Sequence, residues 1–428
     1  MANKKLKVGN VPNLRFPGFT EEWKTKKLGD VMSFKVTNSF SREILNYEAG
    51  IVKNIHYGDI HTKFQTLFNI TKEVVPFINE DINLGRIADE NYCREGDIIF
   101  ADASEDLNDV GKSIEILKLN NEKLLSGLHT LLARPKANYF QKGFNGYLFK
   151  SNTVRLKIQK EAQGSKVLSI NAGRLSNIEI TFPNILEQHK ITIFLSLIDF
   201  RIQTQNKIIE QLETLIQQCR NKIFKQKIRF KDELGNEFSK WKVYKLKDIS
   251  DRVLFKNAEN NQNVLTISAQ LGLISQLDFF NKSVSAKNVS GYYLLKQNDF
   301  AYNKSYSKGY PMGAIKRLKK YDKGIVSTLY ICFRFNGLVN VNFMEQYFES
   351  GIQNTEIEKI AQEGARNHGL LNVGVSDFFN IEINLPSIEE QKRIAALLSK
   401  IDKKIQTEKA ILEQFENQKK YLLHQMFV

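Results

Sequence analysis

The stretch NIEITFPNILEQHKI at residues 177–191 recurs as NIEINLPSIEEQKRI at residues 380–394, an offset of 203 residues. The same offset carries identities further along the chain, from Leu195 to Leu398 and from Ile198-Asp199 to Ile401-Asp402. So many identities at one offset indicate an internal duplication, which fixes the architecture before any short motif is considered. The chain therefore consists of two similar halves.

Weaker matches extend the duplication toward the N-terminus. Trp23 corresponds to Trp241 at an offset of 218, Asp97 to Asp299 at 202, Gly111 to Gly313 at 202, and Tyr147 to Tyr347 at 200. The changing offset indicates small insertions and deletions. Two interpretations are open: a duplication kept for folding alone, or two modules that each engage one half of a two-part target. The positive charge of the chain favours the second.

Each half opens with a section that is rich in short apolar runs, such as Ile98-Ile99-Phe100 and Leu329-Tyr330-Ile331-Cys332-Phe333. Such runs, separated by Gly and Asn, are typical of short strands joined by loops. We therefore predict an α+β fold with one globular module at residues 1–185 and a similar one at residues 229–388.

Each half closes with a long apolar periodicity that starts after Pro183 or Pro386, and proline is tolerated only at a helix start. Apolar residues then alternate at steps of three and four, as in a coiled coil. We predict long helices at residues 186–228 and 389–428, and about 38 residues give a rod of roughly 55–60 Å. The predicted seam residues are Ile198, Ile202, Ile209, Leu212, Ile216, Ile401, Ile405, Leu412, Phe415 and Leu422.

An apolar stripe on a helix has to be buried. We expect the two helices to pack against each other as an antiparallel coiled coil with a pseudo-twofold axis, so that the end of the chain returns to the first module. The alternative, in which each helix packs only on its own module, leaves too much of the stripe uncovered. Gln205 and Glu408 are equivalent polar breaks in the seam. They either fix the register or are solvated, and the sequence favours neither.

Composition narrows the class of partner. The 428 residues include 62 Lys and Arg against 47 Asp and Glu, a net charge of +15, which points to nucleic acid or an anionic membrane. No uninterrupted apolar run is long enough for a membrane span, and the polar N-terminus is not a signal peptide. Three isolated cysteines argue against a disulfide scaffold and a Cys-rich zinc site. We expect a cytoplasmic protein.

Motifs for catalysis are weak. Gly111-Lys112-Ser113 resembles the end of a phosphate-binding loop, but Asp106 occupies the position that requires the first glycine. His56 and His61 do not have the spacing of a metal pair on a helix. Asp97 and Asp299 are better explained as turns that precede strands than as catalytic carboxylates. We therefore predict a binding protein with no catalytic residue and no metal site of its own.

Basic residues interleaved with Tyr, Asn and Ser are suited to phosphates and base edges. One candidate is the loop at residues 303–310, and a second is the Gly-bounded segment at residues 364–369; an ordinary solvated loop or turn is the alternative for each. The predicted DNA-binding residues are Lys304, Tyr306, Lys308 and Tyr310 in the first, Arg366, Asn367 and His368 in the second, and, with less support, Lys53, Asn54, His56, Arg86 and Lys112 in the first half.

With these features, the chain resembles the specificity subunit of bacterial type I restriction-modification enzymes. The resemblance rests on Leu14-Arg15-Phe16-Pro17-Gly18-Phe19 followed by Trp23-x4-Leu28, on the paired Asn-Ile-Glu-Ile-x2-Pro-x3-Glu-Gln-x2-Ile segments, and on the helical run after each. It covers essentially the whole chain. The second half departs from it, because Asp232-Glu233-Leu234-Gly235 replaces Phe-Pro-Gly-Phe and puts the docking of that segment in doubt.

The resemblance implies that each module is a target-recognition domain that reads one half of a bipartite double-stranded DNA site. The helices would set the gap between the half-sites and dock two modification subunits, which bind S-adenosylmethionine and methylate adenine. Restriction subunits that use ATP and Mg²⁺ would join the complex formed by this chain and the modification subunits. The chain itself would be non-catalytic, without a cofactor, and DNA-associated in the bacterial cytoplasm.

Two other classes of function remain as alternatives. A self-contained DNA methyltransferase or nuclease would need a catalytic cluster that the sequence does not reveal. A coiled-coil adaptor without DNA contact would need no basic surface. Phosphate contacts weaken steeply with salt, so the salt dependence of DNA binding separates the adaptor from the DNA-binding alternatives.

Overall fold

The computed structural model describes residues 9–280, 288–361 and 371–428. The chain divides into two compact units, the first comprising Met1–Asn206 and Ile411–Val428 and the second Lys207–Ala410. The boundaries therefore fall within the two long helices, whereas the sequence analysis placed them at the helix ends. The last residues do belong to the first unit, as predicted.

The first unit is built around a five-stranded sheet with the order β2-β11-β7-β9-β5. Strand β7 (Ile98–Ala101) is buried along its whole length between β11 and β9, which explains its uninterrupted apolar sequence. A second, four-stranded sheet has the order β10-β4-β6-β3. The other strands are β1 (Lys24–Lys27), β2 (Met32–Lys35), β3 (Leu45–Asn46), β4 (Val52–Ile55), β5 (Leu67–Asn69), β6 (Phe77–Ile78), β8 (Ala103–Ser104), β9 (Ser113–Lys118), β10 (Lys123–Ser126), β11 (Thr130–Pro135), β12 (Leu168–Ser169) and β13 (Glu179–Phe182).

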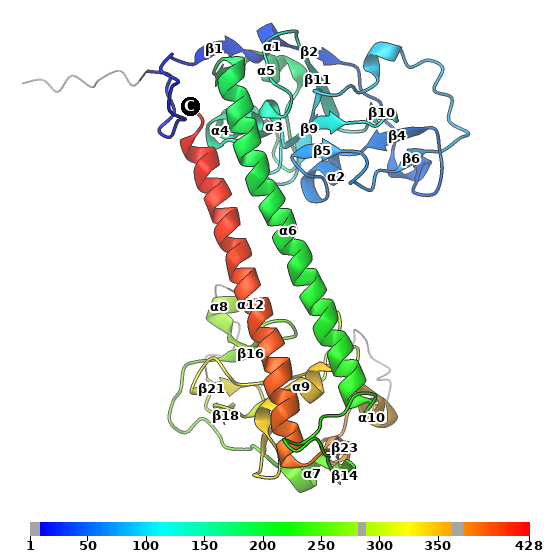
Figure 1. The fold of residues 1–428 in the computed structure, drawn as a ribbon, viewed down its shortest axis with the longest axis vertical. Helices are drawn as coiled ribbons and strands as arrows, with labels where there is room; N and C mark the ends of the chain where they lie inside the picture. Colours follow the sequence, from blue (N-terminus) through cyan, green and yellow to red (C-terminus); the bar gives the residue numbers. More distant parts are fainter. Residues whose placement is uncertain (1–8, 281–287, 362–370) are drawn as a thin grey trace, which may run out of the picture. The chain divides into compact units, whose positions relative to one another are not determined.

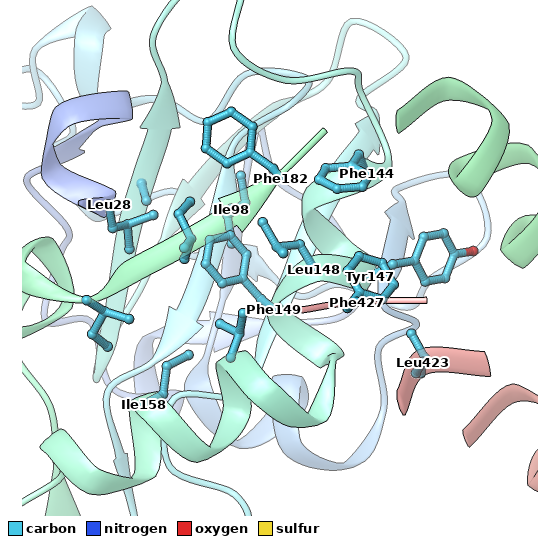
Figure 2. Packing of buried hydrophobic residues seen from close by; sticks show 14 of the residues in the cluster. Leu28, Ile98, Phe144, Tyr147, Leu148, Phe149, Ile158, Phe182, Leu423 and Phe427 are labelled. Carbon is cyan, nitrogen blue, oxygen red and sulfur yellow. The ribbon is translucent and has the colours of Figure 1, made fainter. Parts of the chain in front are cut away.

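Helices cover the large sheet and complete the core of the first unit. They are α1 (Leu28–Val31), α2 (Tyr57–Thr62), α3 (Phe144–Lys150), α4 (Asn152–Glu161) and α5 (Ala172–Asn177). Figure 2 shows Phe144 and Tyr147 of α3 beside Phe427 from the end of the chain, and the Phe144 and Phe427 ring centroids lie 5.8 Å apart. The C-terminal residues are thus part of this hydrophobic core.

The second unit repeats this plan on a smaller scale. Its four-stranded sheet has the order β15-β22-β19-β20, which matches β2-β11-β7-β9 of the first unit. Its strands are β14 (Lys242–Lys245), β15 (Ser250–Arg252), β16 (Leu265–Ser268), β17 (Gly272–Ser275), β18 (Tyr293–Lys296), β19 (Phe300–Asn303), β20 (Ala314–Arg317), β21 (Lys323–Val326), β22 (Ile331–Phe335) and β23 (Glu382–Leu385). Its shorter helices are α7 (Leu246–Ile249), α8 (Gln276–Phe280), α9 (Val341–Glu349), α10 (Asn354–Ile360) and α11 (Val375–Phe379). The α+β prediction is confirmed.

The two long helices are α6 (Ile185–Phe224) and α12 (Ile388–Gln425). Both start within two residues after the predicted prolines. Helix α6 ends before the predicted residue 228, because Gln226 takes a left-handed φ of +56° and its N–H bonds to the Ile223 carbonyl. A left-handed residue is a common way to end a helix.

In the first unit, the start of α6 packs against the end of α12 (Figure 1). Ile191, Leu195 and Ile198 share one hydrophobic cluster with Leu422 and Leu423. An ion pair between Asp199 and Lys419 also joins the two helices. The N-terminal part of one helix therefore meets the C-terminal part of the other, which is an antiparallel pairing.

In the second unit, the end of α6 packs against the start of α12. Ile216 and Ile223 share a cluster with Ile394, Leu398 and Ile405. Arg220 lies 3.3 Å from a carboxylate oxygen of Asp402, and Lys409 lies 2.6 Å from Glu213. Each unit thus contains an antiparallel helix pair that also packs on the local module, so the predicted pairing is confirmed.

The predicted seam residues are all buried or half-buried. The two polar breaks are buried as well, since Gln205 and Glu408 are each 7% exposed. Glu408 forms an ion pair with Lys404 one turn earlier on α12. The structure therefore removes the interpretation in which these two residues are solvated.

Candidate nucleic-acid interface

The repeated Pro-x3-Glu-Gln element joins each module to the start of its long helix. In the first unit, Glu187 is almost fully buried and accepts two hydrogen bonds from Arg15, of 2.7 and 2.8 Å. Gln188 accepts from the Gln141 backbone N–H at 2.9 Å and donates to the Tyr139 and Pro183 carbonyls. Two adjacent side chains thus fix the helix start to two other segments.

The second unit contains the same junction. Glu390 is fully buried and accepts from Arg229 at 2.7 and 3.2 Å, while Gln391 accepts from the Asn340 N–H and donates to the Pro386 carbonyl. The doubt about docking concerned Asp232-Glu233-Leu234-Gly235, and Leu234 in that segment is 86% exposed, whereas the residues just before it are held by Arg229. Arg229 takes the place of Arg15, so the matching residues are Ile228-Arg229-Phe230 and Leu14-Arg15-Phe16, a signal that the sequence analysis missed.

Asp97 and Asp299 are structural, as expected from the sequence. Asp97 accepts from the Arg94 N–H within its turn and from Arg134 on β11 at 2.7 and 2.9 Å. Asp299 accepts from the Lys296 N–H and from Arg334 on β22 at 2.6 and 2.9 Å. The same arrangement occurs in both units and supplies hydrogen-bond donors to both carboxylates. A structural role therefore accounts for Asp97 and Asp299, and no catalytic role is needed to explain them.

The loop after β19 presents two of its predicted DNA-binding residues to solvent. Its backbone folds into a tight turn in which Ser307 and Tyr310 exchange hydrogen bonds, and Gly309 at the tip takes a φ of +84°. Tyr306 is 61% exposed and Lys308 is exposed. Lys304 is half-buried, and its carbonyl accepts from the Leu371 N–H.

Tyr310 points into the unit. Its hydroxyl donates to Glu349 at 2.6 Å and accepts from Lys316 at 2.8 Å. Burial and the Glu349 charge raise the pKa of this hydroxyl. Tyr310 therefore anchors the turn and is not placed to read a base. The other predicted residues of this module, Arg366, Asn367 and His368, lie outside the described residues.

Most of the residues predicted in the first module are engaged within the protein. Lys53 forms an ion pair with Glu122 at 2.5 Å, and Lys112 forms one with Asp109 at 2.5 Å. His56 accepts from the Gly58 N–H at the start of α2, and burial together with the Arg42 charge lowers the pKa of its imidazole. These three residues have local roles, so they are weaker candidates for DNA contact than the sequence suggested.

Asn54 is fully buried and acts through a neighbour. Its side-chain oxygen accepts from Asn38 at 2.8 Å, and Asn38 also donates to the Ser126 carbonyl. These contacts hold the Asn38 amide at the edge of a groove of about 520 Å³. Asn54 is thus a positioning residue for that edge.

Arg86 is exposed and lines the same groove. The groove brings together side chains from four separate segments of the first unit, and the polar ones are Thr37, Asn38, Ser39, Asn83, Arg86, Asp102, His129 and Thr130. Arg can bond guanine, Asn adenine and a carboxylate the amino group of cytosine. The groove therefore has the chemistry of a base-reading surface, and of its residues the sequence analysis predicted only Arg86.

His129 and Asp102 form a coupled pair within this groove. His129 has a left-handed φ of +54°, and its Nδ1 lies 3.3 Å from an Asp102 carboxylate oxygen. Burial raises the pKa of Asp102, and His129 opposes that rise. The separation of the two residues in the sequence does not reveal this pairing. It arises because Ala101, at the end of β7, pairs with Thr130, at the start of β11, and this brings the adjacent residues Asp102 and His129 together.

Two other kinds of site are absent from the described residues. In the parts of the chain that the structure describes, no three His, Cys, Asp or Glu side chains are grouped as metal ligands would be. Within the same residues, no helix combines the length and apolar character needed to cross a membrane.

Comparison with known proteins gives one consistent family. The model of the type I restriction modification DNA specificity domain matches residues 20–214 and again residues 238–417. A putative type I restriction enzyme MjaX specificity subunit from Methanocaldococcus jannaschii is 26% identical, over 98% of this chain and 94% of its own. The MjaVIII specificity subunit of the same organism is 24% identical, over 65% of this chain and 68% of its own.

Solved structures share the fold. The S subunit of a type I restriction-modification system from M. genitalium gives a TM-score of 0.54 at 15% identity, covering 98% of this chain and 99% of that one. A chain from a study of complex assembly in the type I system also gives 0.54 at 15% identity, covering 96% and 98%. With two matched domains that span most of its length, the chain belongs to the type I restriction-modification DNA specificity family, and it is a specificity subunit with two target-recognition domains.

Proposed function

We propose that each target-recognition domain of this chain reads one half of a bipartite double-stranded DNA site, and that the long helices set the unspecified gap between the halves. In this proposal the chain itself performs no chemistry. It selects the DNA sequence on which partner subunits act.

The observation that carries the proposal is a contrast between the two units. Their junctions are built alike, from Arg15 with Glu187 and from Arg229 with Glu390. Their exposed polar surfaces differ: a groove with Arg86, Asp102 and His129 in the first unit, and a turn with Tyr306 and Lys308 in the second. A shared scaffold with divergent polar surfaces is what two readers of different half-sites require.

The helices have the length that a spacer requires. The 40 residues of α6 correspond to about 60 Å at 1.5 Å per residue. DNA half-sites that lie one helical turn apart are separated by about 34–36 Å. A rod longer than that distance can hold two readers on neighbouring turns of one duplex.

Partner subunits are part of the proposal. Helix α6 carries an exposed apolar face in the first unit, formed by Leu186, Ile193, Leu197 and Phe200. The spacings of seven, four and three residues place them on one side of the helix. An exposed apolar face of this kind suits the docking of a modification subunit. The positions offset by 203 residues on α12 are Glu389, Ala396, Lys400 and Lys403, so a second modification subunit would meet a more polar surface.

The rest of the complex follows from the same proposal. The modification subunits would bind S-adenosylmethionine and methylate adenine, and restriction subunits would use ATP and Mg²⁺. This chain would hold none of these cofactors, and the complex would act on DNA in the cytoplasm.

Methylation mapping tests the proposal. Cells that carry the modification subunit with and without this chain would be compared for methylated adenines across the genome. We expect a motif of two short specified halves with a fixed gap, present only with the chain. Methylation that persists without the chain, or a single uninterrupted motif, would overturn the proposal.

The docking face has its own test, which is co-purification of the modification subunit with the chain. Leu197→Asp combined with Phe200→Asp should abolish co-purification, because two charges then lie in the apolar contact. The control Lys160→Asp changes the charge at an exposed position of α4, outside the surfaces proposed for modification subunits on both long helices. Unaltered co-purification of the double variant would rule out this surface as the docking site.

A further inference from the structure

A second feature of the first unit shares no lining residue with the proposed reading groove. A cavity of about 670 Å³ opens between α3, α4 and the paired parts of α6 and α12. Lys150, Arg155, Lys419 and Lys420 line it. A smaller cavity of about 220 Å³ shares Lys150 and Arg155. These two residues therefore form the common wall of two adjoining cavities.

The cations of this region are unequally paired. Lys419 forms an ion pair with Asp199, and Lys112, which lines the smaller cavity, forms one with Asp109. Among the described residues, neither Lys150 nor Arg155 has a carboxylate oxygen within ion-pair distance. The two cations of the shared wall thus have no ion-pair partner of their own, although the carboxylates of Asp199 and Glu416 also line the larger cavity.

The hydrogen bonds of the same two residues are incomplete. Lys150 donates to the Thr66 hydroxyl at 2.9 Å. Arg155 donates through Nη2 to the carbonyls of Asn108 and Val110, at 3.0 and 2.8 Å. Its Nη1 is buried and has no hydrogen-bond partner among the described residues. An unpaired buried donor is costly, and an acceptor in the cavity would remove that cost.

The electrostatic environment agrees with the geometry. Burial and the Lys419 charge lower the pKa of Lys150 to about 8, with the Asp199 charge opposing this shift, and burial lowers the pKa of Arg155. A lowered pKa of a basic side chain means that its charged form is disfavoured, so the site itself disfavours the positive charges of both residues. A bound anion would reverse this effect.

The fold does not require these cations. At the offset of 200 that relates Tyr147 to Tyr347, the second unit has Ser350 where the first has Lys150. At the same offset, it has Thr355 where the first has Arg155. Since the second unit folds in the same way without them, the cluster is a property of the first unit alone.

We propose that this cavity binds the phosphate group of a small phosphate monoester such as a nucleoside monophosphate, with Lys150 and Arg155 as its ligands. A phosphate monoester carries nearly two negative charges at neutral pH, which suits two cations that have no ion-pair partner. The cavity volume lies within the range of about 300–1,000 Å³ that small-molecule sites occupy. Ile202 and Leu423 supply apolar surface for the rest of the ligand.

Isothermal titration calorimetry on the full chain tests the proposal with inorganic phosphate, AMP and adenosine as probes. We expect phosphate and AMP to bind and adenosine, which has no phosphate, not to bind. Lys150→Gln should weaken AMP binding by about tenfold or more, the size of one charge-assisted hydrogen bond. Lys150→Arg keeps the charge and should retain binding. Lys160→Gln, an exposed lysine on α4 that does not line either cavity, is the matched control.

In the calorimetry, the proposal would be overturned by no binding of either phosphate probe, by equal binding of adenosine and AMP, or by an unchanged AMP affinity in Lys150→Gln. Trp23 fluorescence verifies that each variant is folded, because Trp23 lies in the core of the first unit. A DNA arm separates this site from the reading function. A duplex without the recognised sequence should bind wild type and Lys150→Gln alike, whereas a loss confined to duplex binding would assign the lysine to the DNA backbone and overturn the small-ligand site.

Discussion

The buried ion pairs at the two junctions should each stabilise the unit that contains them, and this contribution can be measured separately in each unit. The perturbation is Glu187→Gln in the first unit and Glu390→Gln in the second. Each change removes one buried negative charge, keeps the shape of the side chain, and leaves an arginine without its partner. The effect should stay within the unit that carries it, since each pair joins residues of a single unit.

The magnitudes follow from burial. Glu390 is 0% and Arg229 23% exposed, whereas Glu187 is 1% and Arg15 11% exposed. Removing one partner of a buried pair costs about 3–5 kcal/mol when the other charge stays buried. Arg229 can regain water more easily, so we expect about 2–3 kcal/mol for Glu390→Gln and about 3–4 kcal/mol for Glu187→Gln. With a slope of about 2–3 kcal/mol per molar urea, the smaller change shifts a midpoint by about 1 M.

The chain has two tryptophans, one in each unit, so urea unfolding can be followed unit by unit. Trp241→Phe leaves Trp23 as the reporter of the first unit, and Trp23→Phe leaves Trp241 for the second. Glu187→Gln should shift only the Trp23 transition and Glu390→Gln only the Trp241 transition. The control Glu389→Gln changes an exposed neighbour and should shift neither. Shifts below about 0.5 kcal/mol, the level of ordinary surface substitutions, would refute the role of these pairs.

Two further predictions concern the helices and the core. Inserting about four residues near Gln205, matched by four near Glu408, adds roughly 6 Å of helix and should widen the methylated gap by about two base pairs; an unchanged gap in methylation mapping would count against the spacer. Burial raises the pKa of Glu115 to about 7, above its value of about 4.3 in an unfolded chain. Between these two values the folded state holds a proton that the unfolded state has lost, so stability should fall by up to about 3 kcal/mol as the pH rises from about 4.5 to 7. The free energy of urea unfolding, measured across this range, should lose that slope in Glu115→Gln; equal slopes in the two proteins would contradict the assignment.

The parts of the fold that could be predicted are those set by periodicity and repetition. The duplicated segment and the three-and-four spacing were sufficient for the two helices, their antiparallel pairing and the repeated module, because burying an apolar stripe leaves few arrangements. The exact ends of the helices were harder to predict from the sequence. The end of α6 depends on a left-handed Gln226, and glutamine is not a residue that signals such a turn.

The candidate site could be predicted only in part, because it is assembled across the sheet. Tyr306 and Lys308 were found from local composition, and the structure leaves them exposed. Tyr310 has the same local signal but bonds to Glu349, which is distant in sequence. The groove with Asn38, Asn83 and His129 forms only when four segments meet, so no single stretch of sequence reveals it.

The most direct test of the account asks whether the two units read separate halves of one site. Genome-wide methylation would be mapped for wild type, for Tyr306→Ala with Lys308→Ala in the second unit, and for Arg86→Ala in the first. The account predicts that the first variant relaxes one half of the motif, that Arg86→Ala relaxes the other, and that the gap stays the same in both. Relaxation of the same half by both variants, or of neither, would contradict the division of labour between the two domains.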